Sequence, residues 1–299
     1  MPTSHQWIKE FVLVLFCSAS MQAQEPQDVI KVDTNLVTVN VSVSGDKGRP
    51  LQGLRREDFL LTEESKPMHV EFFDYSGPAS IVLVVDLSSS MKGKKWQKLK
   101  SGMKQFLANA NSGNDYTLIG FSDRTSIIAR SVNEVELWQI LSSLGPDGNT
   151  ALYDAVLLGL NVLAEIPQRH KALILFSDGE DNSSRAVLTD VKREVLARRA
   201  TIYTVGILLD DCVYPFSGER PGRELLSELA TATGGLAHFP RSEEIVLVLK
   251  KIRADLTGQY SLSYYPGEKS PGRRRVQVSI AQQDHHSCKL RYQQYYTLK

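Results

Sequence analysis

The sequence lacks the patterns that would define the common enzyme classes or a nucleic-acid-binding protein. It has no Gly-x-Ser-x-Gly element, no Gly-x-x-x-x-Gly-Lys loop, no glycine fingerprint after a first strand and no His-Glu-x-x-His helix. Lys and Arg number 35 against 34 Asp and Glu, so no basic excess supports contact with phosphate backbones. We therefore expect no nucleic-acid partner, and these motifs give no reason to expect an enzyme.

Long apolar runs are also scarce. The run from Phe11 to Ala19 follows Lys9 and precedes the polar stretch that starts at Gln24. It is too short for a membrane helix, which needs about 20 apolar residues. Its layout is that of a signal peptide over residues 1–23, with retention as an anchor as the alternative. We expect a protein that is secreted or located in the periplasm or cell envelope, with no stable membrane span after cleavage.

Cysteine is rare, with 3 in the whole chain. Cleavage of the signal peptide would leave Cys212 and Cys288. An oxidising exterior permits them to pair, but two separate thiols fit the sequence equally well.

The chain outside the signal peptide divides into three parts by the period of its apolar residues. Residues 28–76 and 259–299 alternate apolar and polar side chains, which is typical of half-buried strands, and the last of these runs, from Leu290 to Leu298, is expected to form one strand. Residues 79–256 instead combine short, continuous apolar runs with longer stretches of helical period, which indicates a parallel sheet covered by helices.

Six strands are expected in the central part. Five are buried apolar runs, and a sixth follows its predecessor after so short a turn that it should pair antiparallel at an edge. The runs are Ile81–Val85, Thr117–Phe121, Ala172–Phe176, Ile202–Ile207 and Leu236–Phe239, with Thr125–Arg130 as the edge strand. We predict a doubly wound, mostly parallel, six-stranded α/β sheet of Rossmann-like type, flanked by an all-β sandwich built from the N- and C-terminal segments, with two separate small β modules as the alternative.

Polar residues that suit a metal ion follow the first buried strand. Asp86, Ser88 and Ser90 lie just beyond its carboxyl end, where open α/β sheets bind ligands. The plainer interpretation is that the serines cap the following helix. Glu180 and Asp181, in a later loop, are expected to be solvated charges.

The motif resembles the Asp-x-Ser-x-Ser start of the metal-ion-dependent adhesion site, or MIDAS, of von Willebrand factor type A domains. Two further segments resemble that family in the same order: the Gly-Asn-Thr loop ending at Thr150 and the Phe-Ser-Asp-Gly element containing Asp178. The flanking β segments also resemble, more loosely, an exported bacterial group related to this family. The resemblance implies that Ser88, Ser90 and Thr150 ligate a cation directly, while Asp86 and Asp178 act largely through bound water.

A site made of hard oxygens suits Mg²⁺ or Mn²⁺. With neutral hydroxyls as the direct ligands and both carboxylates acting largely through water, the ion would still attract another anion, so we expect a protein partner that presents an acidic side chain and no catalysis. Two alternatives stay open. One is a metal-independent structural scaffold, and the other is a metal-assisted hydrolase in which Asp178 acts as the base.

Overall fold

The computed structural model describes residues 36–298 except 46–47, 76, 112, 168–169, 199, 208–218, 242–243, 268–269 and 282–287. The signal peptide predicted at 1–23 and one of the two remaining cysteines, Cys212, lie outside the described residues. Within the described part, no helix combines the length and apolar character needed to cross a membrane.

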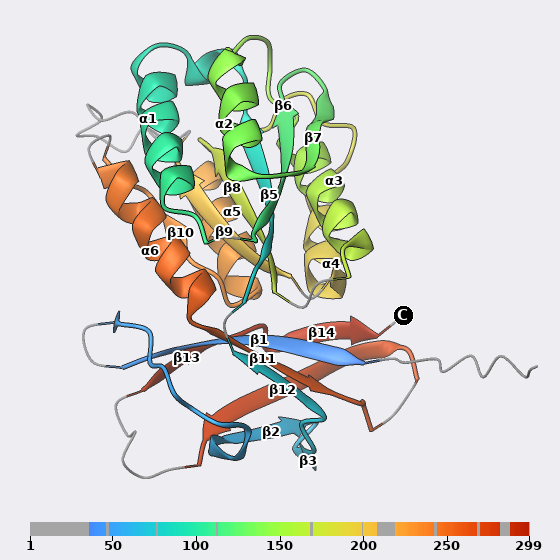
Figure 1. Cartoon of the computed structure of the whole chain (residues 1–299). Helices are drawn as coiled ribbons and strands as arrows, with labels where there is room; N and C mark the ends of the chain where they lie inside the picture. Colours follow the sequence, from blue (N-terminus) through green and yellow to red (C-terminus); the bar gives the residue numbers. More distant parts are fainter. Residues whose placement is uncertain are drawn as a thin grey trace, which may run out of the picture. The chain divides into compact units, whose positions relative to one another are not determined.

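A six-stranded sheet forms the centre of the α/β domain, in the order β10-β9-β8-β5-β6-β7 (Figure 1). Every neighbouring pair is parallel except β6 and β7, which are antiparallel. The strands are β5 (Ser80–Asp86), β6 (Asp115–Phe121), β7 (Thr125–Val132), β8 (Lys171–Ser177), β9 (Thr201–Gly206) and β10 (Ala237–His238). The predicted strands and the predicted antiparallel edge are confirmed.

Helices cover both faces of this sheet, because successive side chains of each buried strand point to opposite faces. Ile81, Leu83 and Val85 of β5 pack with α1, α2 and α6, whereas Val82 and Val84 pack with α3, α4 and α5. The helices are α1 (Lys94–Ala108), α2 (Glu134–Ser143), α3 (Leu152–Glu165), α4 (Leu188–Arg198), α5 (Glu219–Ala232) and α6 (Ile245–Thr257). The domain is therefore doubly wound, and the carboxyl end of β5 lies between its two helical layers.

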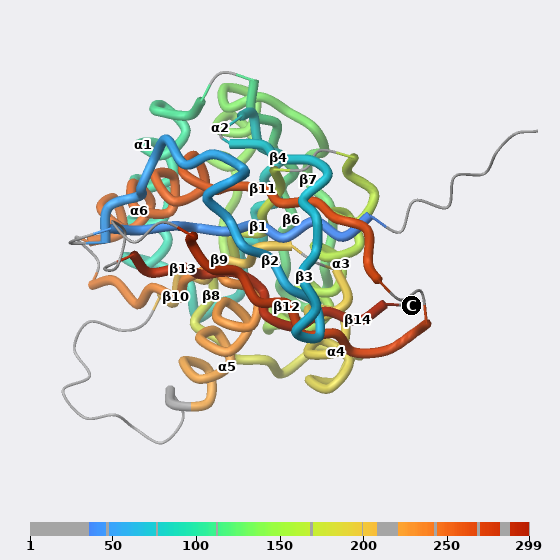
Figure 2. The backbone as a smooth tube through the Cα atoms, turned by 90° about the horizontal axis from the view of Figure 1, so that it is seen from below, coloured from blue at the N-terminus to red at the C-terminus, as the bar shows by residue number. Residues whose placement is uncertain are grey.

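The flanking segments form two four-stranded antiparallel sheets, in the orders β13-β1-β11-β4 and β14-β12-β2-β3. The strands are β1 (Val37–Ser44), β2 (Phe59–Glu63), β3 (Lys66–Met68), β4 (Phe72–Tyr75), β11 (Gln259–Tyr264), β12 (Gly272–Ile280), β13 (Lys289–Arg291) and β14 (Tyr295–Leu298). Both sheets combine strands from before and after the α/β domain, and β1 runs beside β11 (Figure 2). The predicted sandwich is confirmed.

A single apolar core joins these two sheets. Tyr260 of β11 stacks on Tyr75 with ring centroids 4.5 Å apart, and its ring also lies 5.1 Å from that of Phe59 in the other sheet. Aromatic pairs at such distances add to the free energy gained from burial.

The prediction of one strand from Leu290 to Leu298 is wrong. The segment contains two strands, β13 and β14, which belong to different sheets of the sandwich. Between them the chain passes from one sheet to the other, and the hydroxyl of Tyr292 accepts a hydrogen bond from the backbone of Val278 in β12. Alternation of side chains cannot reveal such a crossing, because both short strands keep the same period of two.

Candidate metal centre

Asp86 ends the central strand β5 and is completely buried. Its Oδ1 accepts a hydrogen bond from the backbone N–H of Ser88 at 2.9 Å, and its Oδ2 accepts one from the hydroxyl of Ser177 at 2.8 Å. Burial raises the pKa of Asp86 to about 6; hydrogen bonds from Ser88 and Ser177 oppose that rise, and the charge of Asp178 adds to it. The strand end thus holds a carboxylate that a nearby cation would stabilise.

The two serines of the motif lie next to each other. Their hydroxyl oxygens are 3.0 Å apart, with Ser88 buried and Ser90 exposed. Neither caps α1, which starts at Lys94 with Gly93 as its N-cap residue, and Ser88 makes no side-chain capping bond to the short 3-10 helix Ser89–Met91. The capping interpretation is therefore not supported, and the two hydroxyls bond each other beside Asp86.

The loop that carries Thr150 is fixed beside this motif by backbone hydrogen bonds. The N–H of Ser89 donates to the carbonyl of Gly148 at 2.9 Å. Asn182 bonds Thr150 in both directions: its Oδ1 accepts from the N–H of Thr150 at 2.8 Å, and its own N–H donates to the carbonyl of Thr150 at 2.9 Å. Gly148 has φ +90° and packs against Asp123, so a side chain at this position would be strained and crowded.

Asp178 follows β8, the strand that pairs with β5, and only 9% of the residue is exposed. Its Oδ1 accepts a hydrogen bond from the N–H of Glu180 at 3.4 Å, and its Oδ2 lies 3.5 Å from the Nζ of Lys95. The residue before it, Ser177, donates its hydroxyl hydrogen bond to Asp86, so the chain brings Asp178 to the end of the strand that carries Asp86. Two carboxylates thus approach each other where neighbouring parallel strands end.

The structure brings the three predicted segments together at one edge of the sheet. Hydrogen bonds join Asp86 to Ser88 and Ser88 to Ser90, while Thr150 is joined to the set through its loop. Convergence of all five oxygens on one ion stays a prediction. Among the described residues, no group of three or more His, Cys, Asp and Glu side chains could hold a metal. The candidate set differs in composition, having two carboxylates and three hydroxyls.

Residues outside the predicted ligand set hold these loops. Asp181, expected to be a solvated charge, instead accepts hydrogen bonds from the N–H of Tyr153 at 3.2 Å and the hydroxyl of Ser184 at 2.5 Å. Asp154 accepts from the N–H of Ala186 at 2.9 Å. The run of Asp, Asn and Ser after Asp178 was the available signal, since these side chains often bond nearby backbone.

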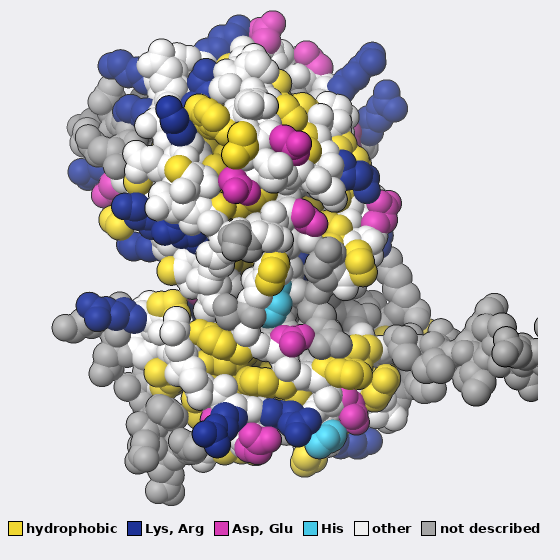
Figure 3. All heavy atoms as spheres, viewed as in Figure 1, with side chains coloured by type: hydrophobic (Ala, Val, Ile, Leu, Met, Phe, Trp, Pro, Cys, Tyr) yellow, Lys and Arg dark blue, Asp and Glu magenta, His cyan; other side chains and the backbone are white. Residues whose placement is uncertain are grey.

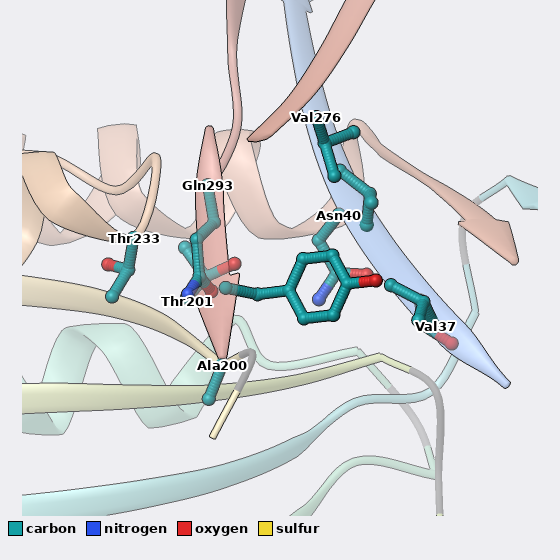
Figure 4. Close-up of a pocket in the computed structure, with 10 residues that line it drawn as sticks. Val37, Asn40, Ala200, Thr201, Thr233, Val276 and Gln293 are labelled. Carbon is teal, nitrogen blue, oxygen red and sulfur yellow. The ribbon is translucent and has the colours of Figure 1, made fainter. Parts of the chain in front are cut away.

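Other hollows lie away from this edge. A cavity of about 10 Å³, drawn in Figure 4 with Asn40 and Gln293 among its lining residues, has room for no more than about one water molecule. An open groove of about 650 Å³ on the sandwich contains Phe72 and Phe73 among charged residues of both signs. Figure 3 shows basic and acidic side chains on the same face, with hydrophobic ones over the sandwich.

Residues 81–180 match the family model described as von Willebrand factor type A domain. With the six-stranded sheet and its two helical layers, this match shows that the central domain has the von Willebrand factor type A fold.

Similar curated proteins are inter-alpha-trypsin inhibitor heavy chains. Heavy chain H4 of Sus scrofa is 24% identical over 174 residues, covering 54% of this chain and 18% of the relative. Heavy chain H4 of Homo sapiens is 26% identical over 177 residues, with the same coverage of 54% and 18%. The chain thus spans only 18% of the length of these two relatives.

Solved structures with a similar arrangement include a von Willebrand factor type A protein from Catenulispora acidiphila, with a TM-score of 0.49, 12% identity and coverage of 88% of this chain and 72% of that one. The PilB minor pilin from Streptococcus sanguinis gives a TM-score of 0.46 at 14% identity and covers 62% of each chain.

Proposed function

We propose that this protein is an exported, non-catalytic binding module that uses a divalent cation to capture a protein partner. Asp86, Ser88, Ser90, Thr150 and Asp178 would hold the cation, and an acidic side chain of the partner would complete its coordination. Mg²⁺ or Mn²⁺ suits this set because its donors are hard oxygens. The looser resemblance of the β segments to an exported bacterial group, and the signal peptide predicted at 1–23, support export.

The observation that carries the proposal is the pairing of buried Asp86 with the Ser88–Ser90 hydroxyls at the carboxyl end of the central strand. A buried carboxylate is unfavourable unless it is bonded or paired with positive charge. Ser88 and Ser177 satisfy part of that need. The serine hydroxyls, 3.0 Å apart, supply neutral oxygens without adding negative charge.

This donor set also explains why a carboxylate should be the preferred ligand. Two carboxylates alone would balance the charge of a divalent ion. Lys95, whose Nζ lies 3.5 Å from one of them, adds a further positive charge, so the occupied site would be positive overall. When bound, the ion supplies an electrophilic position that favours an anion. The residues around it keep the loops fixed, through the bonds that Asn182 and Gly148 make.

Metal binding is the first test. Titration calorimetry with MgCl₂ and with MnCl₂ should detect one site per chain in the wild type. Ser88→Ala and Asp86→Asn should each weaken it about tenfold or more, since each removes a group of the proposed site. Ser142→Ala is the matched control, because Ser142 is exposed on α2 and bonds only within its helix turn in the described contacts. It should bind like the wild type.

Partner capture is the second test. The immobilised full chain is exposed to extracellular material with MgCl₂ and then with a chelator, and a specific partner should elute with the chelator. Loss of capture in Ser88→Ala but not in Ser142→Ala would support the proposal. Calorimetry without heat for either ion, together with unchanged capture by Ser88→Ala, would instead establish the structural scaffold. Hydrolysis of phosphoesters that disappears in Asp86→Ala would establish the hydrolase.

A further inference from the structure

Lys95 reaches into the candidate metal centre from the start of α1. Its Nζ lies 3.5 Å from Oδ2 of Asp178, and the two side chains are only 15% and 10% exposed. The ion pair links segments that are 83 residues apart in the chain. Such a contact is far more shielded from solvent than the surface pair of Lys92 and Asp147, whose side chains are 56% and 85% exposed.

The position of this lysine in its helix is unusual. The positive end of the helix dipole disfavours cations in the first turn, yet α1 begins with Lys94 and Lys95 and has no acidic residue there. The neighbouring helix α2 follows the ordinary pattern, with Glu134 and Glu136 in its first turn. Lys95 therefore occupies a place that the helix itself does not favour, and its stabilising partner is the carboxylate of Asp178.

The charge of Lys95 falls where a metal ion would need the same carboxylate. Asp178 and Asp86 stand at the ends of the neighbouring parallel strands β8 and β5, joined by the hydrogen bond from Ser177 to Asp86, and an ammonium at Asp178 reduces the repulsion between the two carboxylates. A divalent cation would reduce it too. Because like charges repel most strongly where solvent is scarce, the two cations cannot both be bound there without mutual repulsion.

We propose that Lys95 is a built-in counter-ion of the metal site, which neutralises Asp178 in the metal-free protein and weakens divalent-cation binding by competing for that carboxylate. This inference rests on the proposed function, because it concerns the affinity of the same site. It makes the lysine a determinant of metal affinity that contributes no ligand. Occupancy would then depend on the divalent-cation concentration around the exported protein.

The test compares Lys95→Met with Lys94→Met in the full chain. Lys94 precedes Lys95 in the same helical turn, is exposed, and loses the same charge on substitution. Calorimetry with MgCl₂ and with MnCl₂ should give at least about tenfold tighter binding for Lys95→Met and a change within about twofold for Lys94→Met, since solvent and salt screen the exposed charge. Lys95→Arg, which keeps the charge, should stay near the wild type.

Thermal unfolding with a chelator gives a second readout without metal. Lys95→Met should melt at a lower temperature than Lys94→Met, because it leaves Asp86 and Asp178 without the ammonium, and added Mg²⁺ should raise its melting temperature more than that of the control. If Lys95→Met fails to fold, Lys95→Gln is measured in the same way.

The outcomes separate this inference from the proposed function. Tighter binding by Lys95→Met than by Lys94→Met supports the inference, even if the wild type shows no binding, in which case the metal-dependent function of the wild type fails. Equal or weaker binding by Lys95→Met overturns the inference while leaving the function intact if the wild type binds. If no variant binds either ion, both are overturned.

Discussion

The hydroxyl of Tyr203 donates a hydrogen bond to Oδ2 of Asp255 at 2.6 Å, and this contact lies where the α/β domain meets the sandwich. Asp255 belongs to the last turns of α6 and Tyr203 to β9. From the sandwich side, Arg291 of β13 forms an ion pair with the same carboxylate, and the hydroxyl of Ser42 in β1 donates to it at 3.2 Å. One largely buried carboxylate thus binds four elements together.

Substitution of Asp255 should weaken this junction. Asp255→Ala removes the acceptor of the Arg291 Nη2 and of the buried hydroxyl of Tyr203, and we expect the free energy of unfolding to fall by about 3–5 kcal/mol. Urea unfolding followed by circular dichroism measures the change. The matched control is Asp190→Ala, since Asp190 forms an exposed pair with Arg193 that should be worth less than about 1 kcal/mol. Equal effects of the two variants would show that the junction does not depend on this carboxylate.

Asn182 should influence metal affinity although it is not a proposed ligand. It bonds the backbone of Thr150 in both directions. Asn182→Ala removes the bond to the N–H of Thr150 and should weaken Mg²⁺ binding about tenfold, as loss of groups that orient ligands commonly does. Asn161→Ala is the control, because Asn161 is exposed and bonds only Arg198 in the contacts described. Calorimetry that gave one affinity for both variants would contradict this role.

The stability of the metal-free protein should depend on the protonation of Asp86. The pKa of this group is about 6 in the folded chain against an ordinary value of 3.8. Between pH 3.8 and pH 6 the folded state therefore binds more protons than the unfolded state. The contribution of Asp86 to the free energy of unfolding is complete below pH 3.8 and is lost as pH rises through 6. A shift of this size corresponds to at most about 3 kcal/mol.

Urea unfolding in a chelator at pH 4, 5, 6 and 7 measures this effect as the difference between wild type and Asp86→Asn. Asp147→Asn serves as a control of opposite sign, because the hydrogen bond and charge of Lys92 lower the pKa of Asp147, whose stabilising effect is lost as pH falls. A difference between wild type and Asp86→Asn that does not change with pH would refute the prediction.

Glu63 holds two tyrosines inside the sandwich. Its Oε2 accepts hydrogen bonds from the hydroxyls of Tyr264 and Tyr296, both at 2.7 Å, and all three residues are buried. Glu63→Ala leaves both hydroxyls without this acceptor and should lower the free energy of unfolding by about 3 kcal/mol, whereas Tyr296→Phe, which removes one bond, should cost about 1 kcal/mol. Denaturant unfolding compares the two. A smaller loss for Glu63→Ala than for Tyr296→Phe would contradict this account.

The sequence predicted the α/β sheet well because its strands are continuous apolar runs. Every residue of β5 is buried, as the run from Ile81 predicted, and the short turn before Thr125 predicted the antiparallel edge. The positions of Asp86, Ser88 and Ser90 after β5 likewise follow from local order, because the carboxyl end of a parallel strand lies at a known edge.

Contacts between distant segments could not be predicted in this way. Ser177 bonds Asp86 across 91 residues, and Lys95 meets Asp178 across 83. Neither pair produces a periodic pattern, and a lysine in a first helical turn looks like a solvent-exposed charge until the fold places a carboxylate beside it. The break between β13 and β14 was missed for a related reason, since a change of sheet does not alter the alternation of side chains.

The pairing of β1 with β11 has a consequence for the order in which the protein matures. Thr38 and Ser263 bond each other although 225 residues separate them. A ribosome or export channel that releases the amino end first delivers β1 long before its partner, whereas the six strands of the α/β sheet all lie between Ser80 and His238. Since contacts close in sequence form fastest, we expect the α/β domain to fold before the sandwich, whose sheets can be completed only after β11 to β14 have been released.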